Sequence, residues 1–396
     1  MHIRLEGGNP EIREMDGSYK VKEAVPNSNN AGPPLCGPAV GDRPAAAPAA
    51  RWSPPPPKDR TGFEVAIICA LPREASAVSA LFDKRWDDQT YGKALRDSNA
   101  YSTGLIGHHN VVLVHMPQMG KVDAATAAAY LYASFQGIQL ALLVGICGGV
   151  PFGNQLSEEI LLGDVVISKG LVQYDLGRRF PNNRFLRKDT PLDNLPRPAR
   201  KIRAALAKLQ TEQGRGWLQD RTSEYLCVLR RTLSDMGTYP GATEDRLVRS
   251  IYPHKHHEPL ECAICANGDG RDDVCDKAVG MSCEELECHG QELVLRTRPS
   301  RPYEPVVHFG LIASGDTIMK SGEDRDDVAT RDGVIAFEME GAGVWENFPS
   351  SLVIKGVCDY ADSHKSKKWQ NYAAATAAAV TKGFLDNWST GTQFNV

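Results

Sequence analysis

The chain has 396 residues, of which 42% are hydrophobic, and a formal net charge of −4. That length allows one large domain or two ordinary ones, and the small charge gives no indication of nucleic acid or of a membrane as a partner. No apolar run approaches the roughly 18 residues of a membrane helix, and the first fifteen residues lack the apolar segment of a signal peptide. Several of the ten cysteines lie inside apolar runs, which is typical of reduced, buried thiols, so we expect a cytoplasmic protein.

Residues 1–60 differ in composition from the rest of the chain. The stretch 27–58 is dominated by Pro, Ala, Gly and Asn, and it ends in the run Pro54–Pro57. Such a segment cannot bury enough apolar surface to offset its conformational entropy. We therefore expect residues 1–60 to form a disordered arm, either a linker or a polyproline recognition segment, and residues 61–396 to form the folded domain.

From residue 63 onward, patterns of buried strands alternate with helical patterns. The run FEVAIICAL at 63–71 is apolar and rich in β-branched residues, and Pro72 then opens a helical pattern. Ala-rich helices are expected at 121–135 and 371–387. Further strands are expected at 109–116, 139–144, 164–168, 306–313, 333–338 and 352–357. This alternation predicts an α/β fold with a largely parallel or mixed sheet, helices on both faces, and ligands at the carboxyl ends of the strands.

The middle of the chain is less regular. Residues 191–233 look helical and surface-exposed, whereas residues 234–305 are polar and show no convincing periodicity. A structureless stretch of this length is unusual inside a compact domain. We therefore expect 234–305 to be an insertion outside the sheet that can be shortened without loss of the fold.

This insertion contains thiols and imidazoles. One Cys-x2-Cys pair is followed by further cysteines with histidines nearby, and four such groups can close a tetrahedral zinc site. The later spacings match no ribbon or finger motif, so a loose insertion without a metal is the favoured interpretation. The residues are Cys262, Cys265, Cys275, Cys283, Cys288, His254, His256, His257 and His289.

Two polar motifs follow expected strands. In VGICGGV, Gly145 and Gly148 permit close approach of a ligand whose oxygens face exposed amides, or they form a plain tight turn. In FEMEGAG, Glu338 and Glu340 alternate with apolar residues and so share one face, where a carboxylate can accept hydrogen bonds from sugar hydroxyls. The alternative for these two acids is a solvent-exposed charge pair at a helix N-terminus.

A third motif, VCDYADS, places an acid at the end of the last expected strand. Asp359 leaves the apolar strand into a loop of small residues, where it could carry a proton. The alternative role, a helix N-cap, suits Asp362 or Ser363 better.

Taken in order, the motifs resemble those of a known enzyme group. ICALPREASAV, MPQMGKV, VGICGGV, GDVVIS, SGDTI, FEMEGAG and VCDYADS are similar to the nucleoside phosphorylase / methylthioadenosine nucleosidase superfamily, which includes purine and uridine phosphorylase-like domains. The resemblance covers roughly 63–233 and 306–385, and it is greatest to the branch found in filamentous fungi and in fungal NLR-type receptors. It implies a three-layer α/β/α domain with a central mixed sheet.

The resemblance also implies roles for individual side chains. Glu340 matches a ligand of the ribose hydroxyls, and Met339 matches the residue packed beside the sugar. Asp359 matches the acid that protonates or hydrogen-bonds purine N7, and Glu74 matches the carboxylate that orients the attacking water. The expected substrate-binding residues are Arg73, Gly145, Ile146, Cys147, Gly148, Arg178, Arg179, Ile318, Met319, Glu338 and Met339.

The implied reaction is cleavage of the N-glycosidic bond of a purine nucleoside or nucleotide, which needs no cofactor and no metal at the site. Related hexameric phosphorylases hold phosphate with an arginine and a serine where this chain has Leu143 and Ile146, so hydrolysis is favoured and water is the expected co-substrate. Arg73 leaves phosphorolysis open. A non-catalytic nucleotide-sensing or signalling module of NLR type is the alternative outside enzymes.

Other features of the substrate and assembly are left open by the sequence. Arg178, Arg179 and Arg184 either meet a 5′-phosphate or polyphosphate or form a solvated loop. The identity of the purine and of its 5′ group is not determined, and a homo-oligomer is expected.

Overall fold

The computed structural model describes residues 54–153, 158–181, 184–257, 262–267, 274–288, 292–298, 304–348 and 351–389. Of the expected arm, residues 1–53 lie outside these ranges, and residues 54–60 lead directly into a short 3-10 helix, η1 (Arg60–Gly62). None of the helices in the described ranges is long and apolar enough to cross a membrane.

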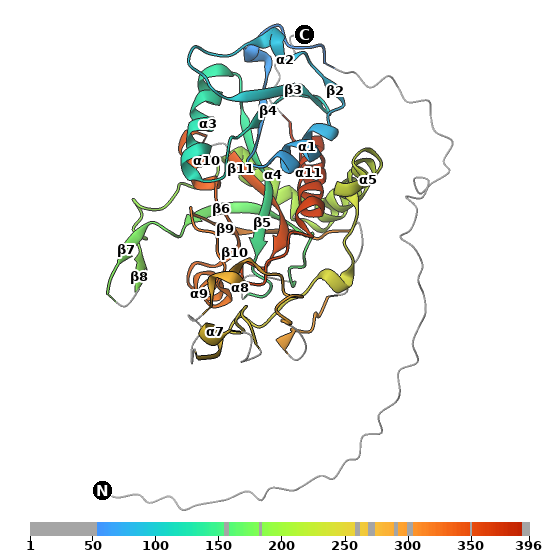
Figure 1. Ribbon diagram of the computed structural model, residues 1–396. Coiled ribbons are helices and arrows are strands. Elements are labelled where there is room, and N and C mark those ends of the chain that lie inside the picture. The colour runs from blue at the N-terminus through green and yellow to red at the C-terminus, as the bar shows by residue number, and fades with distance from the viewer. Residues whose placement is uncertain are drawn as a thin grey trace, which may run out of the picture. The chain divides into compact units, whose positions relative to one another are not determined.

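The strands are β1 (Val65–Cys69), β2 (Lys84–Arg85), β3 (Ala100–Ile106), β4 (His109–His115), β5 (Leu140–Gly149), β6 (Val165–Gln173), β7 (Gly177–Arg179), β8 (Phe185–Arg187), β9 (Val307–Ser314), β10 (Val334–Glu338) and β11 (Ser351–Asp359). In the described residues nine of them form one sheet in the order β10-β9-β6-β11-β5-β1-β4-β3-β2 (Figure 1). Five neighbouring pairs are parallel and the others antiparallel, so the sheet is mixed. The α/β prediction with a mixed sheet is confirmed.

One end of the sheet closes on itself. Besides its parallel pairing with β9, β10 pairs antiparallel with β5, which places Phe337 opposite Gly148. On its other side Gly148 is the register partner of Asp359 on β11. The sequence predicted that β5 ends before the glycines, but the strand runs through them because Gly148 and Gly149 are hydrogen-bonded into the closure. The closure therefore brings the carboxyl ends of β10 and β11 to the same stretch of β5.

The helices are α1 (Pro72–Ala80), α2 (Asp88–Tyr91), α3 (Lys121–Ser134), α4 (Arg200–Leu209), α5 (Glu212–Thr232), α6 (Ser234–Gly237), η2 (Ala242–Glu244), α7 (Ala263–Asn267), α8 (Asp276–Gly280), α9 (Gly322–Asp332), α10 (Gly341–Asn347) and α11 (Gln370–Asn387). Helices α1, α4, α5 and α11 pack against one face of the sheet, and α3 and α10 pack against the other (Figure 1). Alternate β1 residues enter the two cores, Ile67 on the first face and Ile68 on the second. The result is the expected three-layer arrangement.

The prediction that residues 191–233 are surface-exposed was partly wrong. Leu218, Leu226 and Leu229 of α5 are fully buried and belong to the core formed with α11. Because α5 is polar on its outer side, its sequence gives only a weak apolar stripe, and the partner that covers this stripe is about 150 residues away in the chain.

The described residues between 234 and 305 contribute no strand to the nine-stranded sheet. They are nevertheless tied to the domain by buried polar contacts: Tyr360 donates its hydroxyl to Asp245 at 2.5 Å, and Arg298 forms an ion pair with Asp164. The buried Glu159 depends on this segment as well, because Arg296, Thr297 and Arg298 supply its hydrogen-bond and ion-pair partners. Deleting the segment would leave that buried acid without these partners, which is costly. The expectation that it can be shortened without loss of the fold stays a prediction, and these contacts argue against it.

Candidate active site

A cavity of about 340 Å³ lies where β5, β10 and β11 meet the first turn of α1. Pockets of this size hold small organic ligands. Most residues that the sequence analysis singled out line it: Arg73, Glu74, Ile146, Cys147, Gly148, Ile318, Met319, Glu338, Met339, Glu340 and Asp359. The fold thus gathers residues from five separate parts of the chain at one site.

Glu74 projects from the first turn of α1, which begins at Pro72 directly after β1. Its Oε2 accepts the backbone N–H groups of Ala70 at 3.0 Å and Leu71 at 2.9 Å, and its Oε1 accepts that of Ile146 at 2.9 Å. A carboxylate has about four lone-pair directions, so one direction is left over once these contacts within the described chain are made. Burial raises the pKa of Glu74, and this outweighs the opposing effects of Lys355 and the backbone donors. A buried carboxyl of this kind suits a general base near neutral pH.

Two glycines of β5 make room for acids at the site. A Cβ at Gly145 would lie 2.3 Å from Oε1 of Glu74, and a Cβ at Gly148 would lie 2.9 Å from Oδ1 of Asp359. These glycines therefore serve the close approach of two carboxylates. The expected role of exposed amides facing the oxygens of a ligand does not hold for Ile146, because its N–H is donated to Glu74.

The two acids of FEMEGAG have different roles. Glu338 accepts the N–H groups of Glu340 at 3.0 Å and Gly341 at 2.9 Å, so it caps the start of α10. The helix-terminus alternative thus applies to Glu338, although this side chain is buried and not in solvent. Glu340 is also buried, and its Oε2 accepts a hydrogen bond from Lys355 at 2.8 Å.

Lys355, on β11, was missed by the sequence analysis. Its Nζ lies 2.8 Å from Glu340 and 3.7 Å from Glu338. Burial by itself lowers the pKa of Lys355, but the carboxylates of Glu340, Glu338 and Glu74 outweigh this effect and hold that pKa above its ordinary value. The lysine is therefore a permanent cation among three acids. A charged residue within an otherwise apolar strand is the signal that could have identified it.

Asp359 ends β11 and faces the cavity. Its Oδ1 accepts the N–H of Ala361 at 2.9 Å and lies 3.0 Å from Nζ of Lys365. Ala361 is held at a φ of 52°, in the left-handed region that L-residues rarely adopt. Such a conformation persists only where the surroundings impose it, and here it turns the chain so that its N–H reaches Asp359.

Apolar side chains cover the rest of the cavity. Ile318 and Met319 lie on the segment between β9 and α9. Met339 lies between Glu338, which ends β10, and Glu340, which directly precedes α10. Cys147 also lines the site, but burial raises the pKa of its thiol, so it is neutral at physiological pH and unsuited to act as a nucleophile. This apolar wall can accept a flat heterocycle.

Of the arginines expected to bind the substrate, only some line the cavity. Arg178 and Arg179 do not line the cavity; they lie on β7, which pairs only with β8 among the described strands and projects from the body as a hairpin (Figure 1). Arg73 lines the cavity and donates to Asn371 at 2.9 Å. Leu143, one of the positions where phosphorylases hold phosphate, is fully buried in the core and out of reach of a ligand.

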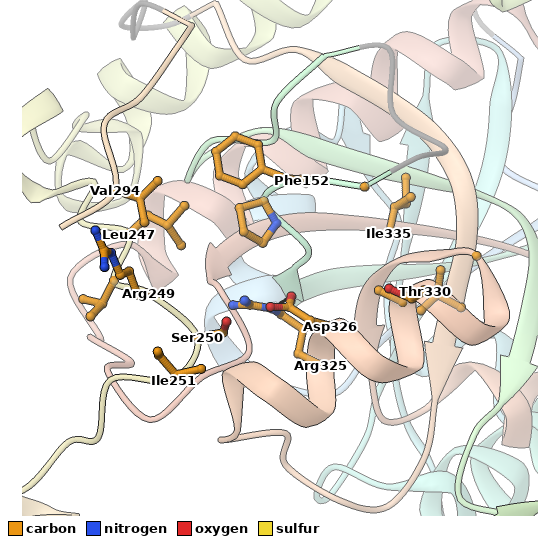
Figure 2. A pocket seen from close by; sticks show the side chains of 16 residues that line it. Phe152, Leu247, Arg249, Ser250, Ile251, Val294, Arg325, Asp326, Thr330 and Ile335 are labelled. Atoms are coloured by element: carbon orange, nitrogen blue, oxygen red, sulfur yellow. Dashed lines mark hydrogen bonds and ion pairs between the residues drawn. The ribbon is translucent and has the colours of Figure 1, made fainter. Parts of the chain in front are cut away.

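A larger cavity, of about 510 Å³, lies between α9 and the insertion (Figure 2). Arg325 and Asp326 of α9 lie side by side there and are joined by a hydrogen bond of 2.8 Å, and Arg325 also donates to the carbonyl of Tyr360 at 2.8 Å. Asp326 is the only acid among its lining residues in the described chain, and it is paired. The larger cavity therefore offers no free acid for general acid or base chemistry.

Residues 64–220 match the family described as Phosphorylase superfamily. The chain belongs to the nucleoside phosphorylase superfamily. The matched part of this domain runs from β1 into α5 and contains Glu74 and the glycines of β5.

The relatives of this chain include several kinds of protein. The domain is 32% identical over 335 residues to a nucleotide-binding leucine-rich repeat (NLR)-like protein of Hyaloscypha variabilis, covering 82% of this chain and 29% of that protein. It is 21% identical over 331 residues to the ATP nucleosidase Cap17 of Escherichia coli, covering 82% and 51%. It is 33% identical over 114 residues to the 5′-methylthioadenosine/S-adenosylhomocysteine nucleosidase of Mycobacterium tuberculosis, covering 28% and 39%. The chain thus spans about half or less of each relative.

Proposed function

We propose that this domain hydrolyses the N-glycosidic bond of a purine nucleoside or nucleotide and releases the free base. The arrangement that carries the proposal is the pair formed by Glu74 and Asp359, both facing one cavity whose remaining wall is largely apolar. Glycosidic cleavage passes through an oxocarbenium-like state, which needs an acid at the leaving group and a carboxylate near the sugar and water. Cytoplasmic location and homo-oligomeric assembly belong to the same proposal.

Each acid has one role in this mechanism. Asp359 hydrogen-bonds or protonates N7 as the base departs, which withdraws electrons from the glycosidic bond. Glu340, held by Lys355, accepts hydrogen bonds from the ribose hydroxyls. Glu74 orients the attacking water with its remaining lone pair and takes up its proton. The bond between the anomeric carbon and the base breaks, and the hydroxyl of the water is added to that carbon. The remaining proton of the water ends on the enzyme or on the base.

Hydrolysis is favoured over phosphorolysis because the cavity is poor in free cations. Of its basic lining residues in the described chain, Arg73 is bonded to Asn371 and Lys365 is paired with Asp359. Glu74 would also repel a phosphate. The names of two relatives, an ATP nucleosidase and a methylthioadenosine nucleosidase, support hydrolysis of a nucleoside. The NLR-like relative supports the alternative of a nucleotide-sensing module.

Purine release is expected in phosphate-free buffer. Purified protein is incubated with adenosine, guanosine, methylthioadenosine, AMP and ATP, with and without phosphate, and free base is measured by chromatography. We expect one substrate to yield base and the free sugar moiety at the same rate in both buffers. Base that appears only with phosphate, together with ribose 1-phosphate, would show a phosphorylase, and tight nucleotide binding without any base release would show a sensor.

The acidic limb of the kcat/KM profile is expected to follow Glu74. A protonated Glu74 cannot take a proton from water, so the rate falls as pH falls through its pKa. Because burial raises this pKa above the ordinary value of 4.5, the decline begins at a higher pH than it would for an exposed glutamate. The profile of Glu74→Gln is the control, since it should be slow at all pH values and lack this limb. An unchanged limb in Glu74→Gln would assign the base to another residue.

A further inference from the structure

Two groups of four metal-ligating side chains lie in the insertion, outside the cavity. The first consists of His256, Cys262, Cys265 and Cys275, and the second of His254, Cys283, Cys288 and His364. In each group the four ligand atoms all lie within 4.8 Å of one another. Seven of the eight residues lie in the stretch 254–288, but His364 comes from the loop after β11, about 75 residues further along the chain.

The spacing within each group fits a tetrahedral zinc ion. Zn–S bonds of about 2.3 Å and Zn–N bonds of about 2.0–2.1 Å give an S···N edge of about 3.6 Å in a tetrahedron. Nδ1 of His256 lies 3.6 Å from Sγ of both Cys265 and Cys275. In the second group, Nδ1 of His254 lies 3.7 Å from Cys283 and 3.5 Å from Cys288.

The histidines of the second group are oriented as ligands. Nε2 of His254 lies 2.9 Å from the carbonyl oxygen of Met281, and Nε2 of His364 lies 3.0 Å from that of Tyr252. A carbonyl only accepts, so Nε2 carries the proton in each ring and Nδ1 keeps its lone pair. In both rings Nδ1 is therefore the atom that can bind a metal. Nδ1 of His364 lies 3.5 Å from Sγ of Cys283. Donation of the second ring nitrogen to a backbone carbonyl is the usual outer contact of a zinc-bound histidine.

Around the two groups, the insertion has only a small apolar core of its own. Its own buried apolar cluster consists of Ala278, Leu286 and Cys288, with partly buried neighbours around it. Thiol–imidazole hydrogen bonds are weak, and small units with so little core usually depend on disulfides or a metal. The eight ligand residues fall into the combinations Cys₃His and Cys₂His₂, both of which are common at closed structural zinc sites.

We propose that the insertion binds two structural zinc ions, one in each group. The thiols release their protons on binding, so the Cys₂His₂ site is neutral and the Cys₃His site carries one negative charge. Lys255, whose Nζ donates to the carbonyl of Cys265 at 3.1 Å, lies beside the negative site. The favoured sequence interpretation, a loose insertion without a metal, is thereby replaced. His289 lies outside the described residues, and His257 approaches Cys288 only at 3.8 Å.

The second zinc also fastens the insertion to the active-site loop. His364 directly precedes Lys365, which pairs with Asp359 at 3.0 Å. A zinc bound to His364 therefore fixes the start of the segment that positions Lys365 against Asp359. This positioning role rests on the proposed function, whereas the zinc sites themselves do not.

The test is metal content of the full chain, purified in reducing buffer without chelators. Mass spectrometry of the digested protein should find two zinc ions per chain and no matching amount of iron, copper or nickel. Cys275→Ala and His364→Ala should each retain one zinc ion, and the double variant should retain none. The matched control is Cys69→Ala, which alters a buried cysteine outside both groups and should retain two zinc ions. If a variant is insoluble, release of zinc from the unaltered chain by a mercurial reagent gives the same count.

A conservative replacement separates ligation from mere packing. His364→Cys keeps a zinc ligand, so it should retain two ions and the thermal stability lost in His364→Ala. If the proposed reaction is confirmed, kcat should fall in His364→Ala and recover in His364→Cys. Less than one zinc per chain after incubation with zinc, or the same content in every variant, overturns the proposal whatever the outcome for activity.

Discussion

Asp359→Asn is expected to lower kcat by at least about a hundredfold, because the proton or hydrogen bond at N7 is needed only as the glycosidic bond breaks. KM should change little. The amide is nearly isosteric and can still accept the N–H of Ala361, so we expect the melting temperature to stay within a few degrees. The measurement is single-turnover release of base beside a melting curve.

A matched change nearby tests whether this loss is specific. The control is Asp316→Asn. Asp316 lies on the segment between β9 and α9, accepts the N–H of Lys121 at 2.8 Å, and is not among the residues that line the cavity. The change should leave turnover within about a factor of two of the parent, as expected for an exposed side chain outside the cavity. A well-folded Asp359→Asn protein with the parent's rate would mean that the acid is another residue.

Lys355→Met is expected to destabilise the fold by about 3–5 kcal/mol, the usual cost of removing one partner of a buried ion pair. The change leaves Glu340, Glu338 and Glu74 buried without their shared cation. Turnover should also fall, since Glu340 loses the group that holds it in place. Urea unfolding monitored by tryptophan fluorescence measures the stability.

The pH dependence of this loss provides its control. Burial already raises the pKa of Glu74 and of Glu338, and removing the lysine removes an influence that lowers both. Groups whose pKa is higher in the folded state bind more protons there, so stability falls as pH rises above the ordinary glutamate value. The loss in free energy of unfolding caused by Lys355→Met should therefore be smaller at acidic pH. Lys368→Met, at an ion pair whose lysine is 49% exposed, should cost about 1 kcal/mol or less. A similar small cost for Lys355→Met would refute the buried-cation account.

Much of the fold follows from local sequence. Strands β1, β4 and β11 are buried on both faces, so their apolar runs are continuous and easily recognised, and Pro72 marks the start of α1 within one residue. Strand β3 was not expected, because it lies near the sheet's edge and its first three residues, Ala100–Ser102, are not fully buried and form no apolar run. Helix α9 was missed for a similar reason, since seven of its eleven residues are charged and its apolar stripe is short.

The candidate site was accessible from sequence only where residues lie close to strand ends. Glu74, Glu340 and Asp359 each follow an apolar strand, and all three face the cavity. Arg178 and Arg179 were expected to bind the substrate because of their charge, but nothing in a run of basic residues tells whether the chain turns back toward the sheet. It does not, because β7 pairs with β8 in a separate hairpin.

By itself, the sequence determined the α/β class, most of the strands, and the acids that end them, because burial on both faces leaves a local pattern. Only the tertiary structure decided which partners those acids have. The closure of β10 onto β5, the burial of Lys355 among three carboxylates, and the meeting of His364 with Cys283 all join residues distant in the chain. Contacts of this kind depend on how separate elements pack in space, and that packing has no period in the sequence from which it could be predicted.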